Sequence, residues 1–317
     1  LTLNKFVDDI LEVTADLMLH PTFPEQEVKV QIEKRKHRYL IENDKVKTLA
    51  QKKLSQVIFG ETHPYANSNS LPDYDALTID QLVEFHAKQY RPERCKIMVS
   101  GRYDETLYAK LDFFFGELVW PRQEKTSEPQ HQVQGDTQKV HYIEKAGAIQ
   151  SAIRMGCEMP NRLHPDFNGL LVLTTILGGY FGSRLMANIR EDKGYTYGIG
   201  AGLMSNYHAC YLMIGSEVGS DVCQAALNEI YFEIERLQTE LVSEDELNLV
   251  RNYLLGEMLR SFDGIFAISN SVKTLIDFNL DFSHYDQYIE EVRNITAERL
   301  RELANTYLKR ERLYEVV

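Results

Sequence analysis

The sequence predicts an α+β protein with two repeated domains, each packing helices on one face of a mostly antiparallel sheet, the first truncated in its N-terminal half. Amphipathic, helix-like segments alternate with short apolar strands on both sides of a polar stretch at residues 121–138. Two groups of residues recur at nearly constant spacing across that stretch. The composition, with 44% hydrophobic and 26% charged residues, is that of a globular protein.

The first 120 residues read as mainly helical. In the first of these segments the apolar residues recur at helical spacing. Thr78 and Gln81 form a capping box at the start of a later one. We expect helices over 3–19, 24–43, 46–59, 78–90 and 105–115, and a strand over 94–100.

Residues 121–138 are rich in Gln, Glu, Thr and Pro, which is typical of a linker. We therefore divide the chain into 1–120, the C-terminal half of a first domain, the linker 121–138, and a second domain at 139–317. In the second domain we expect strands over 139–143, 151–157, from 195 onward, over 209–215 and at the C-terminus, with helices over 166–177, over 184–191, around 227–237 and from 243 to 307. The helix around 227–237 carries an apolar stripe on one face, and Ser243 with Glu246 caps the helix that follows it.

An internal repeat supports two copies of one unit. Glu25 and Glu27 match Glu244 and Glu246 at an offset of 219 residues. A second group recurs at an offset of 218, with Thr78, Leu82, Glu84, Glu93 and Arg94 matching Thr296, Leu300, Glu302, Glu311 and Arg312. At this offset the first-copy counterpart of residue 190 precedes residue 1, so we expect a fragment that lacks the front half of its first domain.

The most informative stretch runs from residue 178 to 202. Gly178, Gly179 and Gly182 make a flexible turn, after which Ser183 can cap a helix over 184–191. Gly194 breaks that helix, and a strand follows. The strand has glycine at 198, 200 and 202, which leaves one of its faces bare and suits close approach by another peptide.

Arg190 and Tyr197 are the candidate substrate-binding residues of this stretch. A guanidinium and a phenol together can hold a peptide carbonyl or carboxylate. The alternative is that Arg190 pairs with Glu191 or Asp192 and that Tyr197 packs in a core. On a regular strand Tyr195 shares a face with Tyr197, but we interpret it as a core or rim aromatic and leave it out of the site.

Charge and cysteine content restrict the partners and the compartment. The net charge of −12 argues against nucleic acid and anionic membrane surfaces, and no apolar run is long enough for a membrane helix. The four cysteines lack CxxC spacing and read as reduced, mostly buried thiols. This favours the cytoplasm, with a periplasmic or organellar location left open.

Several motifs resemble the family of pitrilysin, insulysin and the mitochondrial processing peptidase. They are Gly-Ser-Arg-Leu at 182–185, Ile-Arg-Glu at 189–191, Gly-Tyr-Thr-Tyr-Gly-Ile at 194–199, Pro-Thr-Phe-Pro-Glu at 21–25 and Gly-Glu-Thr-His-Pro-Tyr at 60–65. The family consists of zinc peptidases with an inverted His-x-x-Glu-His motif. The resemblance covers nearly the whole chain and implies that Arg190 and Tyr197 match an Arg/Tyr pair that steadies bound substrate in the second domain.

The zinc ligands of that family do not appear in this sequence. None of the nine histidines belongs to a His-x-x-Glu-His motif. The position that the resemblance implies for the third ligand, a glutamate, holds Arg38, and its supporting position holds Gln31. A guanidinium offers only donors and is a poor zinc ligand. Glu33 and Glu42 are the nearest carboxylates. Glu42, one turn beyond Arg38, could serve as the ligand only if the register is wrong by four residues, and both are expected to be solvated helix charges.

His63 has no partner spaced for a metal site, so we expect its ring to make a hydrogen bond that fixes its loop.

These observations favour a zinc-free, non-catalytic subunit of a two-chain zinc metallopeptidase. Arg190 and Tyr197 would bind and orient the peptide substrate, no residue of this chain would be catalytic or bind metal, and a partner subunit would carry the zinc. Two alternatives stay open. One is an active single-chain zinc endopeptidase whose metal motif lies in the missing N-terminal part, and the other is a non-enzymatic scaffold.

Overall fold

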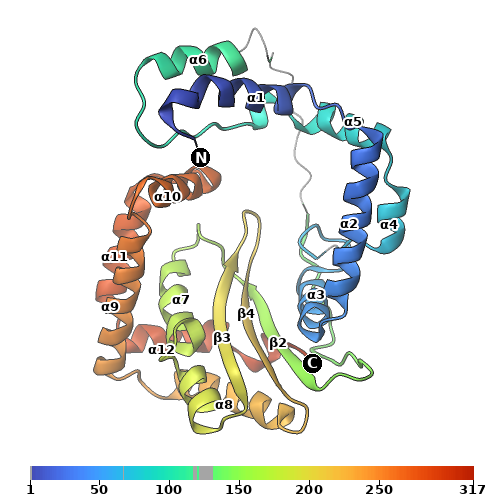
Figure 1. The fold of residues 1–317 in the computed structure, drawn as a ribbon. Coiled ribbons are helices and arrows are strands. Elements are labelled where there is room, and N and C mark those ends of the chain that lie inside the picture. The colour runs from blue at the N-terminus through green and yellow to red at the C-terminus, as the bar shows by residue number, and fades with distance from the viewer. Residues whose placement is uncertain (1, 67, 117–119, 121–130) are drawn as a thin grey trace. The chain divides into compact units, whose positions relative to one another are not determined.

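The computed structural model describes residues 2–66, 68–116, 120 and 131–317. The chain divides into two compact units, a first unit of residues 1–41 with 69–130 and a second unit of residues 42–68 with 131–317. The fold is α+β, with one mixed five-stranded sheet (Figure 1). A repeated second sheet, which the sequence predicted, is not seen in the described part of the chain.

The described part of the first unit is helical. Its elements are η1 (Asn4–Phe6), α1 (Val7–Leu19), α2 (Glu25–Asn43), α4 (Leu71–Ala76), α5 (Ile79–Gln89), η2 (Pro92–Arg94) and α6 (Thr106–Phe115). The predicted capping box holds, because the Gln81 amide donates to the Thr78 hydroxyl at 3.2 Å and the Thr78 amide donates to the Gln81 side chain at 2.9 Å.

The strand expected at 94–100 is wrong. Residues 95–100 follow η2 without regular structure, and Ile97 and Val99 stay exposed. A strand needs a neighbour to accept and donate its backbone hydrogen bonds, and the described residues of the first unit include no other strand. The apolar pattern is present in the sequence, but no described strand of this unit is available to form backbone hydrogen bonds with it.

The second unit holds the sheet. Its elements are α3 (Val46–Phe59), β1 (Val140–His141), β2 (Gln150–Met159), α7 (Phe167–Thr174), η3 (Thr175–Gly179), η4 (Met186–Asp192), β3 (Thr196–Ser205), β4 (Cys210–Gly219), α8 (Cys223–Thr239), α9 (Glu244–Arg260), α10 (Ile265–Phe278), α11 (Ser283–Asn294), α12 (Ala297–Tyr307), η5 (Arg310–Arg312) and β5 (Tyr314–Val316). The strand order is β1-β5-β2-β4-β3, with β1 parallel to β5 and all other neighbours antiparallel.

One face of the sheet packs against helices α7, α8 and α12 (Figure 1). Alternate residues of β2, including Ile153 and Met155, point into this core and are fully buried. The predicted apolar stripe of α8 lies in the same core, with Leu227, Ile230 and Leu237 buried. The expectation of helices on one sheet face is met in part, because most helices of this unit pack in this core but α3 lies on the other face.

The opposite face is partly covered by α3. Leu54 and Phe59 of α3 pack with Ala152 of β2 and Tyr314 of β5 in a second, smaller core. The end of α3 is also bonded to the stretch read as linker, because the Gln134 amide donates to the Phe59 carbonyl at 3.0 Å. Most of that stretch lies outside the described residues, and the domain boundaries drawn from the sequence stay a prediction.

Among the described residues, no helix combines the length and the apolar character that crossing a bilayer would require.

Candidate functional site

Two π-helical turns cover the outer edge of β3. Residues 166–177 were expected as one helix, but α7 ends at Thr174 and continues into the π-helical turn η3. Gly178 of η3 lies so close to β3 that a Cβ there would stand 2.5 Å from the Ala201 nitrogen. The Ile199 amide contacts the Met186 sulfur of η4 at 3.5 Å. The middle of this edge is therefore closed to strand addition, and only the glycine face remains open.

The helix expected over 184–191 is wound mainly as the π-helix η4. The cap predicted for Ser183 is wrong, because its buried hydroxyl makes no hydrogen bond. Gly194 ends the segment as expected, with φ of 67°, which glycine adopts without strain. The turn leads directly into β3.

Tyr197 stands on a bulge at the start of β3. The pairing with β4 shifts register between Thr196 and Ile199. Two hydroxyls hold the bulge: the Gly198 amide donates to Thr196 Oγ1 at 3.1 Å, and Ser216 Oγ lies 3.0 Å from the Gly198 carbonyl oxygen. The Tyr197 side chain is 95% exposed. The core position considered for it is therefore wrong.

Arg190 lies on η4 with its guanidinium carbon 4.5 Å from the centre of the exposed Phe181 ring. Its Nη1 is 3.9 Å from a Glu191 carboxylate oxygen, so the Arg190–Glu191 ion pair considered from the sequence is present, at a long distance. No hydrogen bond, ion pair or ring contact joins Arg190 to Tyr197 in this described segment. The structure therefore places both candidates at the η4–β3 junction without a direct bond between them.

Tyr195, which the sequence left out of the site, lies half-buried against the main core. Its amide donates to the Ile189 carbonyl at 3.0 Å. The bulge that follows separates its environment from that of Tyr197. The interpretation as a core or rim aromatic holds.

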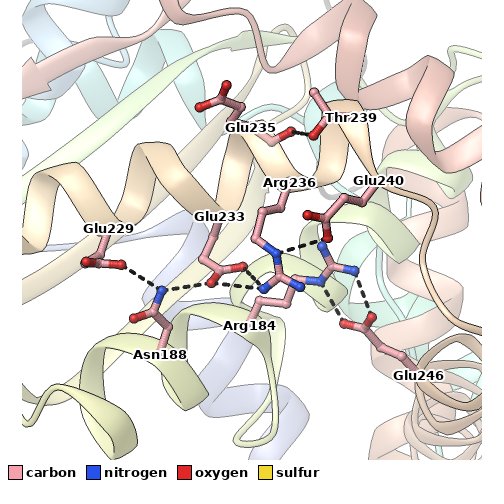
Figure 2. Close-up of polar contacts among 9 residues, drawn as sticks. All are labelled: Arg184, Asn188, Glu229, Glu233, Glu235, Arg236, Thr239, Glu240 and Glu246. Atoms are coloured by element: carbon pink, nitrogen blue, oxygen red, sulfur yellow. Dashed lines mark hydrogen bonds and ion pairs between the residues drawn. The ribbon is translucent and has the colours of Figure 1, made fainter.

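A nearly buried ion pair anchors the segment that leads into η4. Arg184 Nε and Nη2 donate to the two carboxylate oxygens of Glu246 at 2.9 and 2.8 Å (Figure 2). The Arg184 side chain is 8% exposed and that of Glu246 26%. Ser243 caps α9 as predicted by accepting from the Glu246 amide at 3.3 Å, but the Glu246 carboxylate reaches Arg184 instead of closing a capping box.

Two carboxylates of α8 hold η4 itself. The Asn188 amide group donates to Glu229 at 3.0 Å and to the buried Glu233 at 2.8 Å (Figure 2). Arg236 donates to Glu233 at 3.1 Å and to Glu240 at 3.2 Å. η4 is thus tied to α8 by side chains that are far from it in sequence, which fixes the backbone that carries Arg190.

A groove of about 640 Å³ lies on the sheet face opposite the main core, between α3 and strands β3 and β4. Glycines 198, 200 and 202 of β3 and Gly215 of β4 line it, so the bare glycine face that the sequence predicted borders an open cavity. The lining residues with side chains are Lys47, Thr48, Gln51, Lys52, Arg154, Ala201, Met204, Met213, Ser216 and Glu217.

Charge in the groove is mostly positive. Arg154 Nη2 bonds to Glu217 at 2.5 Å, and its Nη1 donates to the Ser216 carbonyl at 3.1 Å. Burial lowers the pKa of Lys52 because it disfavours the charged form. Its ammonium donates to Asn43 at 2.5 Å.

The positions that matter for zinc lie on α2. Arg38 and Gln31 are exposed there. Glu33 pairs with Lys36 at 3.2 Å and Glu42 with Lys45 at 2.7 Å, as expected for helix-face charges. Within the described ranges, no group of three or more His, Cys, Asp or Glu side chains is placed to hold a metal ion.

His63 fixes its loop as predicted. Its Nδ1 accepts from the Tyr65 amide at 3.1 Å, and its ring stacks on Phe59.

The chain belongs to a family of peptidase-related proteins. The profile described as "Peptidase M16 inactive domain" matches residues 76–254, more than half of the sequence. The chain is 22% identical over 310 residues to YmxG of Bacillus subtilis, described as an uncharacterized zinc protease, covering 95% of this chain and 73% of the relative. It is 26% identical over 271 residues to an uncharacterized zinc protease of Mycobacterium leprae, covering 80% of this chain and 57% of that protein.

Solved structures share the fold. A protease from Helicobacter pylori superposes with a TM-score of 0.87 at 17% identity, over 99% of this chain and 77% of that one. A chain of complex III2 from Candida albicans superposes with a TM-score of 0.74 at 12% identity, over 98% of this chain and 74% of that one. The fold therefore occurs both in a protease and in a multi-subunit complex.

Sequence reasoning missed the α3 wall of the groove and the Arg184–Glu246 anchor. Alternating glycine signalled a bare strand face, but no local pattern connects Lys47 with Gly200 or Arg184 with Glu246. These pairs are created by packing alone. For the Arg184–Glu246 pair, the sequence offered one indication, the opposite charges of two residues in separate predicted helices.

Proposed function

We propose that this chain is the zinc-free, substrate-holding part of a two-chain M16 peptidase. The observation that carries the proposal is the placement of Tyr197. This residue is 95% exposed and lies at the start of β3, the strand whose glycine face lines an open groove. A solvated tyrosine on a bulge held by two hydroxyls is an unusual arrangement for a structural residue, since its ring buries almost nothing.

The pair would act by orienting the peptide. The phenol of Tyr197 and the guanidinium of Arg190 can each donate a hydrogen bond to a peptide carbonyl oxygen. The Arg190 guanidinium contacts the Phe181 ring and lies 3.9 Å from Glu191, and the anchored η4 backbone limits the positions that it can take. Holding the carbonyl in one orientation reduces the entropic cost of reaching the transition state, because the substrate is already oriented when it is bound. Cleavage itself belongs to the zinc-bearing partner.

Zinc content and peptidase activity test this proposal, for the protein alone and mixed with a zinc-bearing relative from the same source. We expect neither zinc nor activity alone, and activity in the mixture that falls on Arg190→Ala and on Tyr197→Phe. Matched controls are Arg293→Ala and Tyr142→Phe, both at exposed positions outside the site. Equal activity of all four variants in the mixture would refute the roles given to Arg190 and Tyr197.

An active single-chain zinc endopeptidase is the second candidate. The relatives from Bacillus subtilis and Mycobacterium leprae are described as zinc proteases, and this chain spans 73% and 57% of their lengths. Bound zinc and activity in the protein alone would favour this candidate over the helper role. A protein inactive in both preparations would favour a scaffold.

We also propose that the stretches 1–120 and 139–317 derive from one repeated unit. The residues that recur at offsets of 218 and 219 predict that whole helices recur at these offsets too. α3 (46–59) and α10 (265–278) have the same length at an offset of 219, and α5 (79–89) and α12 (297–307) the same length at 218. The short η2 and η5 turns also recur at 218. A longer form of this chain with a second sheet before α1 would support the repeat.

A further inference from the structure

The glycine face of the groove is a flat surface two strands wide. Gly200 of β3 pairs with Gly215 of β4, so neither strand carries a side chain at that level. Among the described residues, a Cβ added at Gly200 would meet only the Gly178 carbonyl oxygen, at 3.5 Å, and one added at Gly198 would meet nothing within 4 Å. This part of the groove is therefore bare peptide backbone, which a flat group can approach closely.

Two methionines border this surface. Met213 of β4 pairs with Gly202 of β3, and a Cβ added at Gly202 would lie 3.8 Å from Cε of Met204. Both methionines are half-buried and line the groove, and Met213 also packs against the smaller core. A thioether adapts to irregular apolar shapes and makes favourable contacts with aromatic rings. This border therefore favours an apolar side chain and, among apolar side chains, an aromatic one.

Arg154 of β2 borders the surface on its other side. It pairs with Gly215, and a Cβ added at Gly215 would stand 3.2 Å from its Nη1. Nη1 already donates to the Ile153 and Ser216 carbonyls, and Nη2 donates to Glu217. Because Glu217 also balances its charge, Arg154 offers the face of a guanidinium and not an unpaired cation. The negative face of an aromatic ring complements a guanidinium in charge.

An aromatic side chain matches all of these borders. Its ring is flat, as the backbone surface at Gly200 is, and it is uncharged, so the Arg154–Glu217 pair stays intact. An aliphatic side chain would gain neither the ring–thioether nor the ring–guanidinium contact. The groove volume of about 640 Å³ lies within the range of ligand sites, about 300–1,000 Å³. Tyr197 directly precedes Gly198, so a peptide held at Tyr197 begins next to the groove.

We propose that the groove binds an aromatic side chain of the peptide substrate, with its ring flat on the glycine face between Met213 and Arg154. This inference rests on the proposed function and adds a substrate class to it, peptides with a phenylalanine, tyrosine or tryptophan in the segment beside the Arg190–Tyr197 pair. The backbone surface sets the orientation of the ring, and the methionines and the guanidinium set the preference for it.

Peptide binding to the whole chain, followed by fluorescence anisotropy, tests the proposal. The probes are three labelled peptides that differ only at one central position, which holds phenylalanine, cyclohexylalanine or alanine. Cyclohexylalanine has nearly the size of phenylalanine but no π system. We expect the phenylalanine peptide to bind about tenfold more tightly than the alanine peptide, as for burial of one large apolar side chain, and about threefold more tightly than the cyclohexylalanine peptide.

Gly200→Ala tests the glycine face. It places a methyl group on the bare surface, where the nearest atom is 3.5 Å away, an ordinary contact, so the strand should still fold. We expect it to weaken binding of the phenylalanine peptide severalfold and to leave the alanine peptide unchanged. Gly256→Ala is the matched control, because this glycine of α9 also has open space at its Cβ and lies outside the groove lining.

Met213→Leu tests the thioether. It keeps an apolar side chain of similar volume, so it should lower the preference for phenylalanine over cyclohexylalanine and leave binding of the cyclohexylalanine peptide unchanged. Met258→Leu, on α9 and outside the groove lining, is the matched control. Far-UV circular dichroism of each variant separates a loss of binding from a loss of fold.

The outcomes distinguish this inference from the proposed function. An alanine peptide that binds as tightly as the phenylalanine peptide would remove the subsite, and equal binding of the phenylalanine and cyclohexylalanine peptides would remove its aromatic character. Either result, with binding that still falls on Arg190→Ala, keeps the proposed function. A phenylalanine preference that Gly200→Ala abolishes and Arg190→Ala leaves intact would keep the subsite and remove the role given to Arg190. If none of the three peptides binds the wild-type chain, both are wrong.

Discussion

Replacing Glu246 by alanine should destabilise the second unit by leaving the guanidinium of Arg184 without its acceptor. The Arg184 side chain is 8% exposed, and both of its bonds to Glu246 are shorter than 3 Å. Its remaining nitrogen, Nη1, is already buried without a hydrogen-bond partner among the described residues. Removing one partner of a buried pair costs about 3–5 kcal/mol. Because Glu246 is 26% exposed and water can replace part of its carboxylate, we expect about 2–3 kcal/mol.

Urea unfolding followed by far-UV circular dichroism measures this loss. Fluorescence is less suitable, because the only tryptophan of the sequence, Trp120, belongs to the first unit. The expected loss corresponds to a fall in melting temperature of about 5–10 °C, at about 2–4 °C per kcal/mol for a unit of this size. Glu246→Gln should recover part of the stability, because an amide oxygen still accepts one bond from Arg184.

Two controls separate the anchor from surface charge. Glu235→Ala removes an exposed carboxylate on α8 that points away from the network in Figure 2 and should change stability by less than about 0.5 kcal/mol. Glu240→Ala removes the solvent-side partner of Arg236, which is 56% exposed, and should cost less than about 1 kcal/mol. If Glu246→Ala costs no more than Glu240→Ala, the argument from burial is refuted.

Gly178→Ala should lower stability by about 1–3 kcal/mol, because its Cβ would lie 2.5 Å from the backbone nitrogen of Ala201, an atom that cannot turn aside; an unchanged melting temperature would contradict this. In the native protein a thiol reagent should modify the partly exposed Cys95 first and the three buried cysteines only after urea is added. Burial raises the pKa of the Cys157 thiol from 9.0 to about 11, so the folded state keeps a proton that the unfolded state releases. Stability should therefore fall as the pH rises between those values, by at most about 1.4 kcal/mol per pH unit from this group, and Cys157→Ala should flatten the urea midpoint against pH.

The sequence by itself determined the features that depend on neighbours along the chain. The helix over 46–59, the Thr78 and Ser243 caps, the break at Gly194 and the buried stripe of α8 all follow from local spacing and local hydrogen bonds. The spacing of apolar side chains, the capping groups and the conformation of glycine each act within a few residues. The sequence alone is therefore enough to predict the features that depend on them.

Tertiary structure decided what depends on residues that packing brings together. Residues 95–100 have the pattern of a strand, but no strand lies beside them in the described part of the chain. Ser183 precedes a π-helix, and its hydroxyl makes no hydrogen bond there. The bulge that exposes Tyr197 requires Ser216 from β4, and the groove requires α3 against the sheet. Hydrogen-bond pairing and close packing are satisfied between segments that are distant in sequence. The sequence therefore identified Arg190 and Tyr197 as candidates, but it did not predict the residues that surround them in the fold.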